Sequence, residues 1–260
     1  MQGPLTPEEI HQFIDAGFVK IDNAFPKDVA EQCCEILWKD SGCDPNDPTT
    51  WTKPVVRLGD YGQEPFRIAA NTEKLHGAYD QLVGTGRWFP RGSLGTFPIR
   101  FPSNADPGDA GWHADAGFYA NDGTMRSNIY SRGRLLLMLF LFTDTEINDA
   151  PTRILSGSHL DVPRILEPYG ENGLSFIELA QLLPDSTLSR DVVYATGSAG
   201  TVYLCHPFLI HGAQSHNGTK PRILAQPPLM PRSDESIRVH RENNDYSPVE
   251  IAIRRGLSLE

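Results

Sequence analysis

The stretch GTVYLCHPFLIHGAQSHNGTKPRI, residues 200–223, decides the fold. It begins with an apolar segment, continues through the turn-rich sequence SHNGTKP, and returns to apolar residues. A turn of this composition lets the next strand run antiparallel beside the first. We therefore expect two neighbouring antiparallel strands here, with His211 on the first and Arg222 at the start of the second.

The same pattern of short apolar segments and turn residues extends over much of the chain. From about Trp88 onward, short apolar or alternating segments are separated by Gly, Pro, Asn and Asp. One of them, LLLMLFLF at residues 135–142, is typical of a central strand buried on both faces. Regular short strands with turn signals favour a β-sandwich or barrel. The expected strands are 95–101, 110–115, 134–142, 152–155, 199–205, 208–212 and 221–229.

The residues before this region have helical patterns. Thr6, Pro7 and Glu9 form a helix-start signal, and further helices are expected at about 26–38, 72–84 and 173–183, with a short strand at 17–21. Residues 39–65 are rich in turn formers and are expected to be loop or lid. We expect one domain over 1–260: a mainly helical part with the lid (1–87), the β core (88–231), and a C-terminal extension (232–260).

The composition excludes several classes of function. The 260 residues carry a net charge of −10, so a nucleic-acid partner is not expected. The longest apolar run is too short to cross a membrane as a helix, and the N-terminus shows no signal peptide. The four cysteines form no CxxC pair and are expected to be reduced thiols. These features predict a soluble, cytoplasmic protein.

The stretch GWHADAGF, residues 111–118, carries the first sign of chemistry. His113 and Asp115 are two residues apart, so on a strand they point to the same face. An imidazole and a carboxylate together are part of the ligand set of non-haem Fe(II), which takes two histidines and one carboxylate on one side of the metal. The tripeptide alone is a weak signal, and a second histidine is required.

The opening stretch offers two candidates for that histidine, His206 and His211. On a regular strand they would point to opposite faces, so at most one reaches the interior, although Pro207 could interrupt the strand. Arg222 favours His211, because the antiparallel return can bring its guanidinium into the same cavity, where it can bind a carboxylate with two hydrogen bonds. An open metal beside a carboxylate clamp suits 2-oxoglutarate, with its keto-acid end on iron and its far carboxylate on Arg222.

Three stretches, WHADAGF, DAPTRILSGSHL and LIHGAQSHNGTKPRI, together resemble the phytanoyl-CoA dioxygenase family of Fe(II)/2-oxoglutarate oxygenases. The family has an H-x-D pair, an NG-x₅-PGSH-like turn segment, and a distal His followed about eleven residues later by Arg. The N-terminal LTPEEIHQFIDAGFVKIDNAF also resembles the opening of this family. The resemblance covers most of residues 5–230.

The resemblance implies a mainly β fold with flanking helices, a double-stranded β-helix (a jelly-roll, cupin-like barrel), with the site in its mouth. It implies that His113, Asp115 and His211 bind Fe(II), that Arg222 anchors 2-oxoglutarate, and that Arg100 is a weaker candidate for contact with this cosubstrate. The implied activity is O₂-dependent hydroxylation of an unactivated C–H bond of a small molecule, with release of succinate and CO₂.

The sequence departs from the family pattern at a few positions. Ala213 stands where members often have a serine that contacts the cosubstrate. Asp149 and Ala150 replace Asn-Gly, and Ser156 replaces the proline of PGSH. The first departure removes one hydrogen bond, and the others affect local turns. His159 is expected to be a structural residue, and His206 and His216 are expected to be structural or surface residues.

Other functions remain open from the sequence. They are a desaturase, cyclase or epimerase of the same chemistry, a non-catalytic jelly-roll protein that binds a metal or small acid, and a structural β-domain. A halogenase is disfavoured because such enzymes lack the carboxylate ligand that Asp115 provides. The substrate is an acyl-CoA, a free acid, an amino-acid derivative or a natural product, and an anionic one could meet one of four nearby arginines, namely Arg126, Arg132, Arg134 and Arg153.

Overall fold

The apolar run at 135–142 forms β6 (Leu136–Leu141), the strand around which the larger sheet is built. The computed structural model describes residues 3–233 and 237–259. In it β6 pairs antiparallel with β10 (Val202–Cys205) and, on its other edge, with β12 (Leu224–Ala225) and β13 (Pro228–Leu229). β1 (Phe18–Ile21) completes the sheet beside β10. The expected central strand is therefore confirmed.

The two faces of β6 are buried in different places. Leu136, Met138 and Phe140 pack into the larger apolar cluster, together with side chains of the helices. Leu137 and Leu139 point the other way, into a smaller cluster that contains Ile154 of the second sheet. Because side chains alternate along a strand, an unbroken apolar run is what a strand covered on both sides requires.

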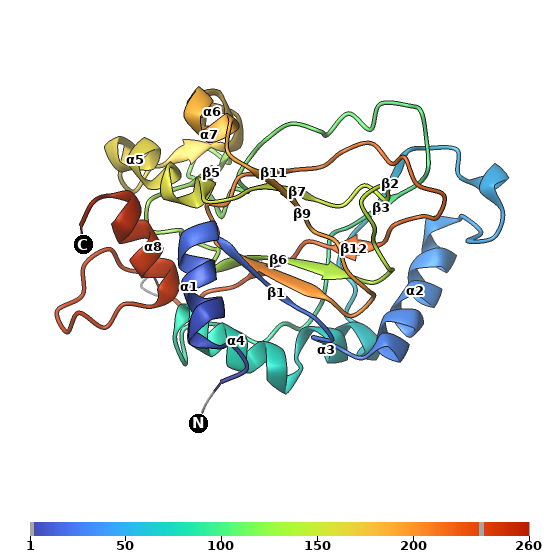
Figure 1. Cartoon of the computed structure of the whole chain (residues 1–260), viewed down its shortest axis with the longest axis horizontal. Coiled ribbons are helices and arrows are strands. Elements are labelled where there is room, and N and C mark those ends of the chain that lie inside the picture. Colours follow the sequence, from blue (N-terminus) through green and yellow to red (C-terminus); the bar gives the residue numbers. More distant parts are fainter. Residues whose placement is uncertain (1–2, 234–236, 260) are drawn as a thin grey trace.

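The second sheet contains β11 (His211–Gly212), β7 (Arg153–Leu155) and β9 (Val192–Tyr194), all antiparallel. Figure 1 shows it lying across the larger sheet, with α3 (Glu64–Ala70) and α4 (Glu73–Val83) on the opposite side. The smaller apolar cluster fills the space between the two sheets. Two facing antiparallel sheets with flanking helices are the layered arrangement expected for a jelly roll.

The longer helices lie on the face of the larger sheet that is turned away from the second sheet, and beyond both of its ends (Figure 1). They are α1 (Pro7–Ala16), α2 (Lys27–Ser41), α3 (Glu64–Ala70), α4 (Glu73–Val83) and α8 (Pro248–Gly256). α1 begins with the expected capping box between Thr6 and Glu9. α8 packs against α1, α4 and the short helix α5 (Val162–Leu166), so residues far apart in the sequence share one apolar cluster.

Smaller elements surround the open end of the sheets. β2 (Val55–Leu58) pairs with β3 (Phe97–Arg100), and β5 (Met125–Ser127) pairs with β4 (Phe118–Tyr119) and β8 (Leu174–Ser175). The short helices are α5 (Val162–Leu166), α6 (Phe176–Gln181), α7 (Asp185–Leu188), η1 (Pro48–Thr50), η2 (Ser158–Leu160) and η3 (Glu167–Tyr169).

The structure differs from the expectation for residues 200–223, 39–65 and 110–115. The strands before and after the turn SHNGTKP are not neighbours, because β11 pairs with β7 in the second sheet while β12 pairs with β6 in the larger one. Residues 55–58 are a strand rather than loop, because the sequence VVRL pairs with β3 and buries Val55. Residues 110–115 lie mostly outside the strands, and only His113 forms a β-bridge, to His211. The helix expected at 173–183 is shorter, because residues 174–175 first pair with β5.

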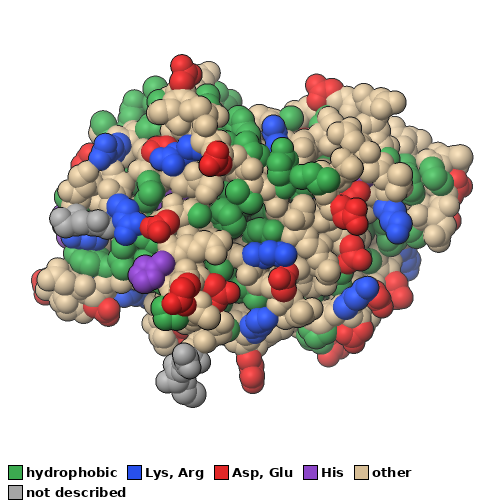
Figure 2. Space-filling model, viewed as in Figure 1, with side chains coloured by type: hydrophobic (Ala, Val, Ile, Leu, Met, Phe, Trp, Pro, Cys, Tyr) green, Lys and Arg blue, Asp and Glu red, His purple; other side chains and the backbone are tan. Residues whose placement is uncertain are grey.

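The surface carries charges of both signs. On the face that Figure 2 shows, acidic and basic side chains are interspersed. No helix within residues 3–233 and 237–259 is long and apolar enough to cross a membrane. The four cysteines are free thiols, as the sequence predicted.

Candidate metal centre and cosubstrate cavity

His113 and His211 lie directly opposite each other on an isolated antiparallel β-bridge. Each backbone N–H donates to the other residue's carbonyl, over 2.9 and 2.8 Å. Residues paired in this way project their side chains to the same face, and the two imidazole centroids are 4.4 Å apart. Asp115 follows His113 by two residues and turns its carboxylate to the same point. One potential ligand atom from each of the three lies within 4.8 Å of the others.

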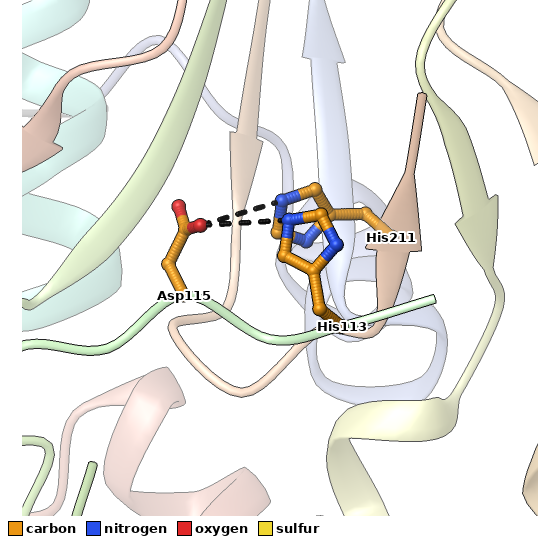
Figure 3. A group of neighbouring side chains, drawn as sticks. All are labelled: His113, Asp115 and His211. Atoms are coloured by element: carbon orange, nitrogen blue, oxygen red, sulfur yellow. Dashed lines mark ion pairs between the residues drawn. The ribbon is translucent and has the colours of Figure 1, made fainter. Parts of the chain in front are cut away.

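The orientation of the imidazoles suits metal binding. Asp115 Oδ1 is 3.7 Å from Nε2 of His113 and 3.8 Å from Nε2 of His211, as Figure 3 shows. These distances are longer than hydrogen bonds. The Nδ1 atoms each lie 3.0 Å from a backbone carbonyl, of Gly111 and Leu209 respectively. A proton on Nδ1 satisfies that carbonyl and leaves the Nε2 lone pair facing Asp115, which is how metal-binding histidines are usually held.

The electrostatics favour the protonation states that a metal needs. Burial lowers the pKa of His211 to about 4, although Asp115 opposes the shift. Burial raises the pKa of Asp115, but Arg134 and the two histidines outweigh it and hold the pKa below its ordinary value. At neutral pH His211 is therefore neutral and Asp115 is ionised, as metal ligands must be. Arg134 Nη1 lies 3.2 Å from Oδ2, the oxygen that does not face the histidines.

A cavity of about 510 Å³ opens beside these three residues, and both predicted arginines line it. Arg100 and Arg222 occupy a second isolated antiparallel β-bridge, with backbone N–O distances of 2.9 and 2.8 Å. Their side chains therefore lie on the same face. Both residues are buried, with 3% and 2% of their surface exposed. This cavity is called the cosubstrate cavity below.

Arg222 is incompletely satisfied within the described residues. Its Nε and Nη1 are buried there without a hydrogen-bond partner. Burial, followed by the neighbouring Arg100, holds its pKa well below the ordinary value. Arg100 is paired with Asp109 at 2.6 Å, and Asp109 also pairs with Arg57. One carboxylate thus pairs with two arginines and leaves Arg222 without a paired acid in the described part of the chain, so a ligand carboxylate beside Arg222 would supply the missing charge and acceptors.

All five residues singled out from the sequence meet in this cavity: His113, Asp115, His211, Arg100 and Arg222. Arg100 is not a surface arginine. The other histidines of the motifs lie elsewhere: His159 and His206 are buried, with Nε2 near the carbonyls of Ile14 and Val249. β10 ends at Cys205, so Pro207 does interrupt the strand.

Sequence reasoning missed several residues of the cavity. Thr152 is the clearest case, because β7 pairs with β11 and the register that joins Arg153 to Gly212 places Thr152 opposite Ala213. The pairing of these two strands was the signal that could have found it. Asp109, in the loop before His113, has no recognisable pattern around it.

Of the four arginines considered for an anionic substrate, only Arg134 lines a cavity beside Asp115. Arg126 pairs with Asp122 on the surface, and Arg132 lies over the ring of Phe118. Arg153 lies over Trp112 and donates to the carbonyl of Ala213. Arg126 and Arg153 thus have clear partners in the protein itself.

Comparisons with known proteins agree with this geometry. The family model for Phytanoyl-CoA dioxygenase (PhyH) matches residues 74–224, more than half of the chain. No curated protein sequence matches significantly.

One similar solved structure is SnoK from nogalamycin biosynthesis, which is described as a non-heme, alpha-ketoglutarate-dependent carbocyclase. The two sequences are 18% identical, the similarity covers 85% of this chain and 82% of the SnoK chain, and the TM-score is 0.59. EctD from S. alaskensis, with 2-oxoglutarate and 5-hydroxyectoine, is 18% identical over 86% and 76%, with a TM-score of 0.54. HygX from Streptomyces hygroscopicus, with nickel and 2-oxoglutarate, is 19% identical over 85% of both chains, with a TM-score of 0.54. These similarities show that the chain has the expected jelly-roll fold.

Proposed function

Because the chain belongs to the phytanoyl-CoA dioxygenase family, we propose that it is an Fe(II)- and 2-oxoglutarate-dependent oxygenase that hydroxylates a small molecule. The overall reaction consumes a C–H bond, O₂ and 2-oxoglutarate, and yields the alcohol, succinate and CO₂. One oxygen atom enters the product and the other enters succinate.

One observation carries the proposal: three side chains able to bind a metal converge beside a buried arginine that lacks a partner for two of its nitrogens. Two imidazoles and one carboxylate on the same side of an ion leave its remaining positions open. Iron held there would supply the oxidative chemistry. SnoK, EctD and HygX are described with alpha-ketoglutarate dependence or bound 2-oxoglutarate, which supports the same cosubstrate here.

The chain's own residues have distinct roles in this proposal. His113, Asp115 and His211 hold the iron, and the carbonyls of Gly111 and Leu209 fix the two imidazoles. Arg222 binds the distal carboxylate of 2-oxoglutarate, and Arg100, anchored by Asp109, adds positive charge beside it. Burial of both arginines keeps water from competing for that carboxylate. Phe176 lies edge-on to His113 at 5.0 Å and covers part of the site.

Hydroxylation is the outcome proposed, although solved structures of this fold include a carbocyclase and an epimerase. These outcomes share the consumption of 2-oxoglutarate, whereas a non-catalytic binding protein would not consume it. The discriminating experiment incubates the purified protein with Fe(II), 2-oxoglutarate and O₂, and measures succinate and CO₂. The proposal predicts slow formation of both in equal amounts even without substrate.

The variants His113→Ala and Asp115→Ala are expected to abolish this turnover. His240→Ala, at an exposed histidine outside the site, is the matched control and should retain it. If the wild-type protein binds iron and 2-oxoglutarate but forms no succinate, the binding-protein interpretation replaces the oxygenase. Mass spectrometry of a converted substrate then separates a gain of one oxygen from a cyclised or epimerised product.

A further inference from the structure

A second cavity, of about 540 Å³, adjoins the cosubstrate cavity. Thr96, Asp115 and Gln226 line both cavities. The carboxylate that faces both histidines therefore stands at the boundary between them. The first cavity contains Arg100 and Arg222, and the second contains Arg91 and Arg134. We call the second one the Arg91–Arg134 cavity.

Arg134 lines this cavity, and some of its guanidinium N–H groups have no hydrogen-bond partner among the described residues. Its Nη1 is 3.2 Å from Asp115 Oδ2, and its Nη2 is 3.4 Å from the carbonyl of Ala116. Its Nε is buried without a hydrogen-bond partner among the described residues. The guanidinium is therefore held in place by Asp115 while part of its donor capacity is unused.

Arg91 also lines this cavity and is held by two backbone carbonyls. Its Nε donates to the carbonyl of Ser93 at 2.9 Å, and its Nη1 donates to the carbonyl of Pro228 at 2.6 Å. Both acceptors are neutral, so the charge of Arg91 is not cancelled by these bonds. Burial lowers the pKa of Arg91, Asp60 opposes the shift, and Arg134 is close enough to lower the pKa further.

The rest of the lining limits the kind of molecule that fits. Among the described residues, the apolar side chains that line the Arg91–Arg134 cavity are Pro228 and Met230, and Met230 is 41% exposed. Asp60 is an exposed acidic residue of the lining, and Asp115 is already shared with Arg134 and the histidines. A long hydrocarbon chain would gain little here, because it would displace water from charged groups without apolar partners.

We propose that the Arg91–Arg134 cavity is the primary substrate site, and that its two arginines bind an oxyanion of a compact polar substrate, either a carboxylate or a phosphate ester. The substrate class is thus a small anionic molecule rather than a fatty acyl chain. Two guanidinium groups next to a site where a reacting C–H must lie give the orientation that such chemistry requires. The inference rests on the proposed function, because the site matters for turnover only if iron and 2-oxoglutarate occupy the adjoining one.

The test is a binding measurement on the anaerobic protein loaded with Fe(II) and 2-oxoglutarate. The weak visible absorption of the iron–keto-acid chelate is recorded first, so a failure of the proposed function is detected before any probe is added. Three probes are then titrated by calorimetry: hippurate carries a carboxylate, phenyl phosphate carries a phosphate ester, and hippuramide is the neutral counterpart of hippurate. The inference predicts that at least one anion binds tenfold or more tightly than hippuramide.

Variants separate charge recognition from a structural role. Arg91→Gln should bring the ratio of anion to hippuramide affinity close to one, whereas Arg91→Lys should preserve most of it. A purely structural loss would weaken all three probes alike and leave the ratio unchanged. Arg67→Gln, at an exposed arginine of α3, is the matched control. The inference is overturned if the loaded wild-type protein binds neither anion better than hippuramide, or if Arg91→Gln keeps the ratio.

Discussion

Thr152 and Ala213 face each other at the ends of β7 and β11, on the wall of the cosubstrate cavity. The family pattern often has a serine at the position of Ala213, so this chain lacks that hydroxyl group. Thr152 is buried and lies across from the gap. We propose that its hydroxyl replaces the one that Ala213 does not provide.

The residue-scale prediction is that Thr152→Val weakens 2-oxoglutarate binding. A hydroxyl that donates to a carboxylate of the cosubstrate contributes about 1.5–3 kcal/mol, so its loss corresponds to roughly a 10- to 150-fold rise in the dissociation constant. Thr152→Ser keeps the hydroxyl and should stay close to wild type. Calorimetric titration with 2-oxoglutarate under anaerobic conditions measures all three proteins. Equal affinities for the valine and serine variants would show that this hydroxyl has no contact with the cosubstrate.

His159 has a different role, because it is buried in the protein far from the cavity lining. Its Nε2 lies 3.0 Å from the carbonyl of Ile14, and its ring is 4.8 Å from that of His206. Burial lowers the pKa of His159 to about 4. An unfolded histidine titrates near 6.5. Between these two values the unfolded chain binds a proton that the folded chain does not.

The folded state should therefore lose stability as the pH falls from about 6.5 to 4. This one residue contributes up to about 1.4 kcal/mol of unfolding free energy per pH unit. His159→Gln, which can still donate to Ile14, should reduce the slope but not remove it, because His206 is also buried. Urea unfolding of both proteins at pH 7, 6 and 5 measures the difference. Parallel curves would contradict the assignment of a neutral buried His159.

At the scale of elements, α8 was not foreseen from the sequence. The C-terminal residues are charged and mixed, yet Ser247 caps the helix and Glu250 is fully buried. Glu250 is paired with Arg87, which is 163 residues away in the sequence, and with Arg241, which is nine residues away. A buried glutamate looks like a surface residue in the sequence, because its partners become visible only when the chain is folded.

The element-scale prediction concerns Ile253, which α8 buries completely. Ile253→Ala should lower the unfolding free energy by about 2–5 kcal/mol. We propose that the chain unfolds as one cooperative unit, so the whole transition should shift to lower denaturant. Ile177→Ala, at a position 62% exposed on α6, should change stability by less than about 0.5 kcal/mol. A separate early transition in Ile253→Ala would mean that α8 belongs to an independent unit.

Other elements also differ in whether the sequence predicts them. β6 and α1 could be predicted because an apolar run and a capping box are local signals. β9 and the short helices α5 and α7 could not, since their residues are partly exposed and their pairing depends on distant segments. The strand at 110–115 was only partly right, because the metal pair needs a single β-bridge and not a full strand.

At the scale of the whole molecule, two β-bridges bring the site together. One joins His113 to His211 and the other joins Arg100 to Arg222. The sequence identified all four as candidate site residues, because each lies in a recognisable motif or at a characteristic spacing from one. It did not predict that the pairs are cross-strand partners, nor that Asp109, Arg57 and Arg134 set the charges around them. Asp109 and Arg134 lie in loops whose paths have no periodic signal, and Arg57 lies on β2, a strand that the sequence did not predict.

The central claim is that these four residues and Asp115 form one iron and 2-oxoglutarate site. Anaerobic titration of the purified protein with Fe(II) and 2-oxoglutarate tests it most directly. The account predicts a weak visible charge-transfer band that is lost in His113→Ala. In Arg222→Leu the band should require about 10- to 150-fold more 2-oxoglutarate, because the variant loses a hydrogen bond between charged groups that contributes about 1.5–3 kcal/mol. No band from folded wild-type protein with excess iron, or a band that persists in His113→Ala, would contradict the account.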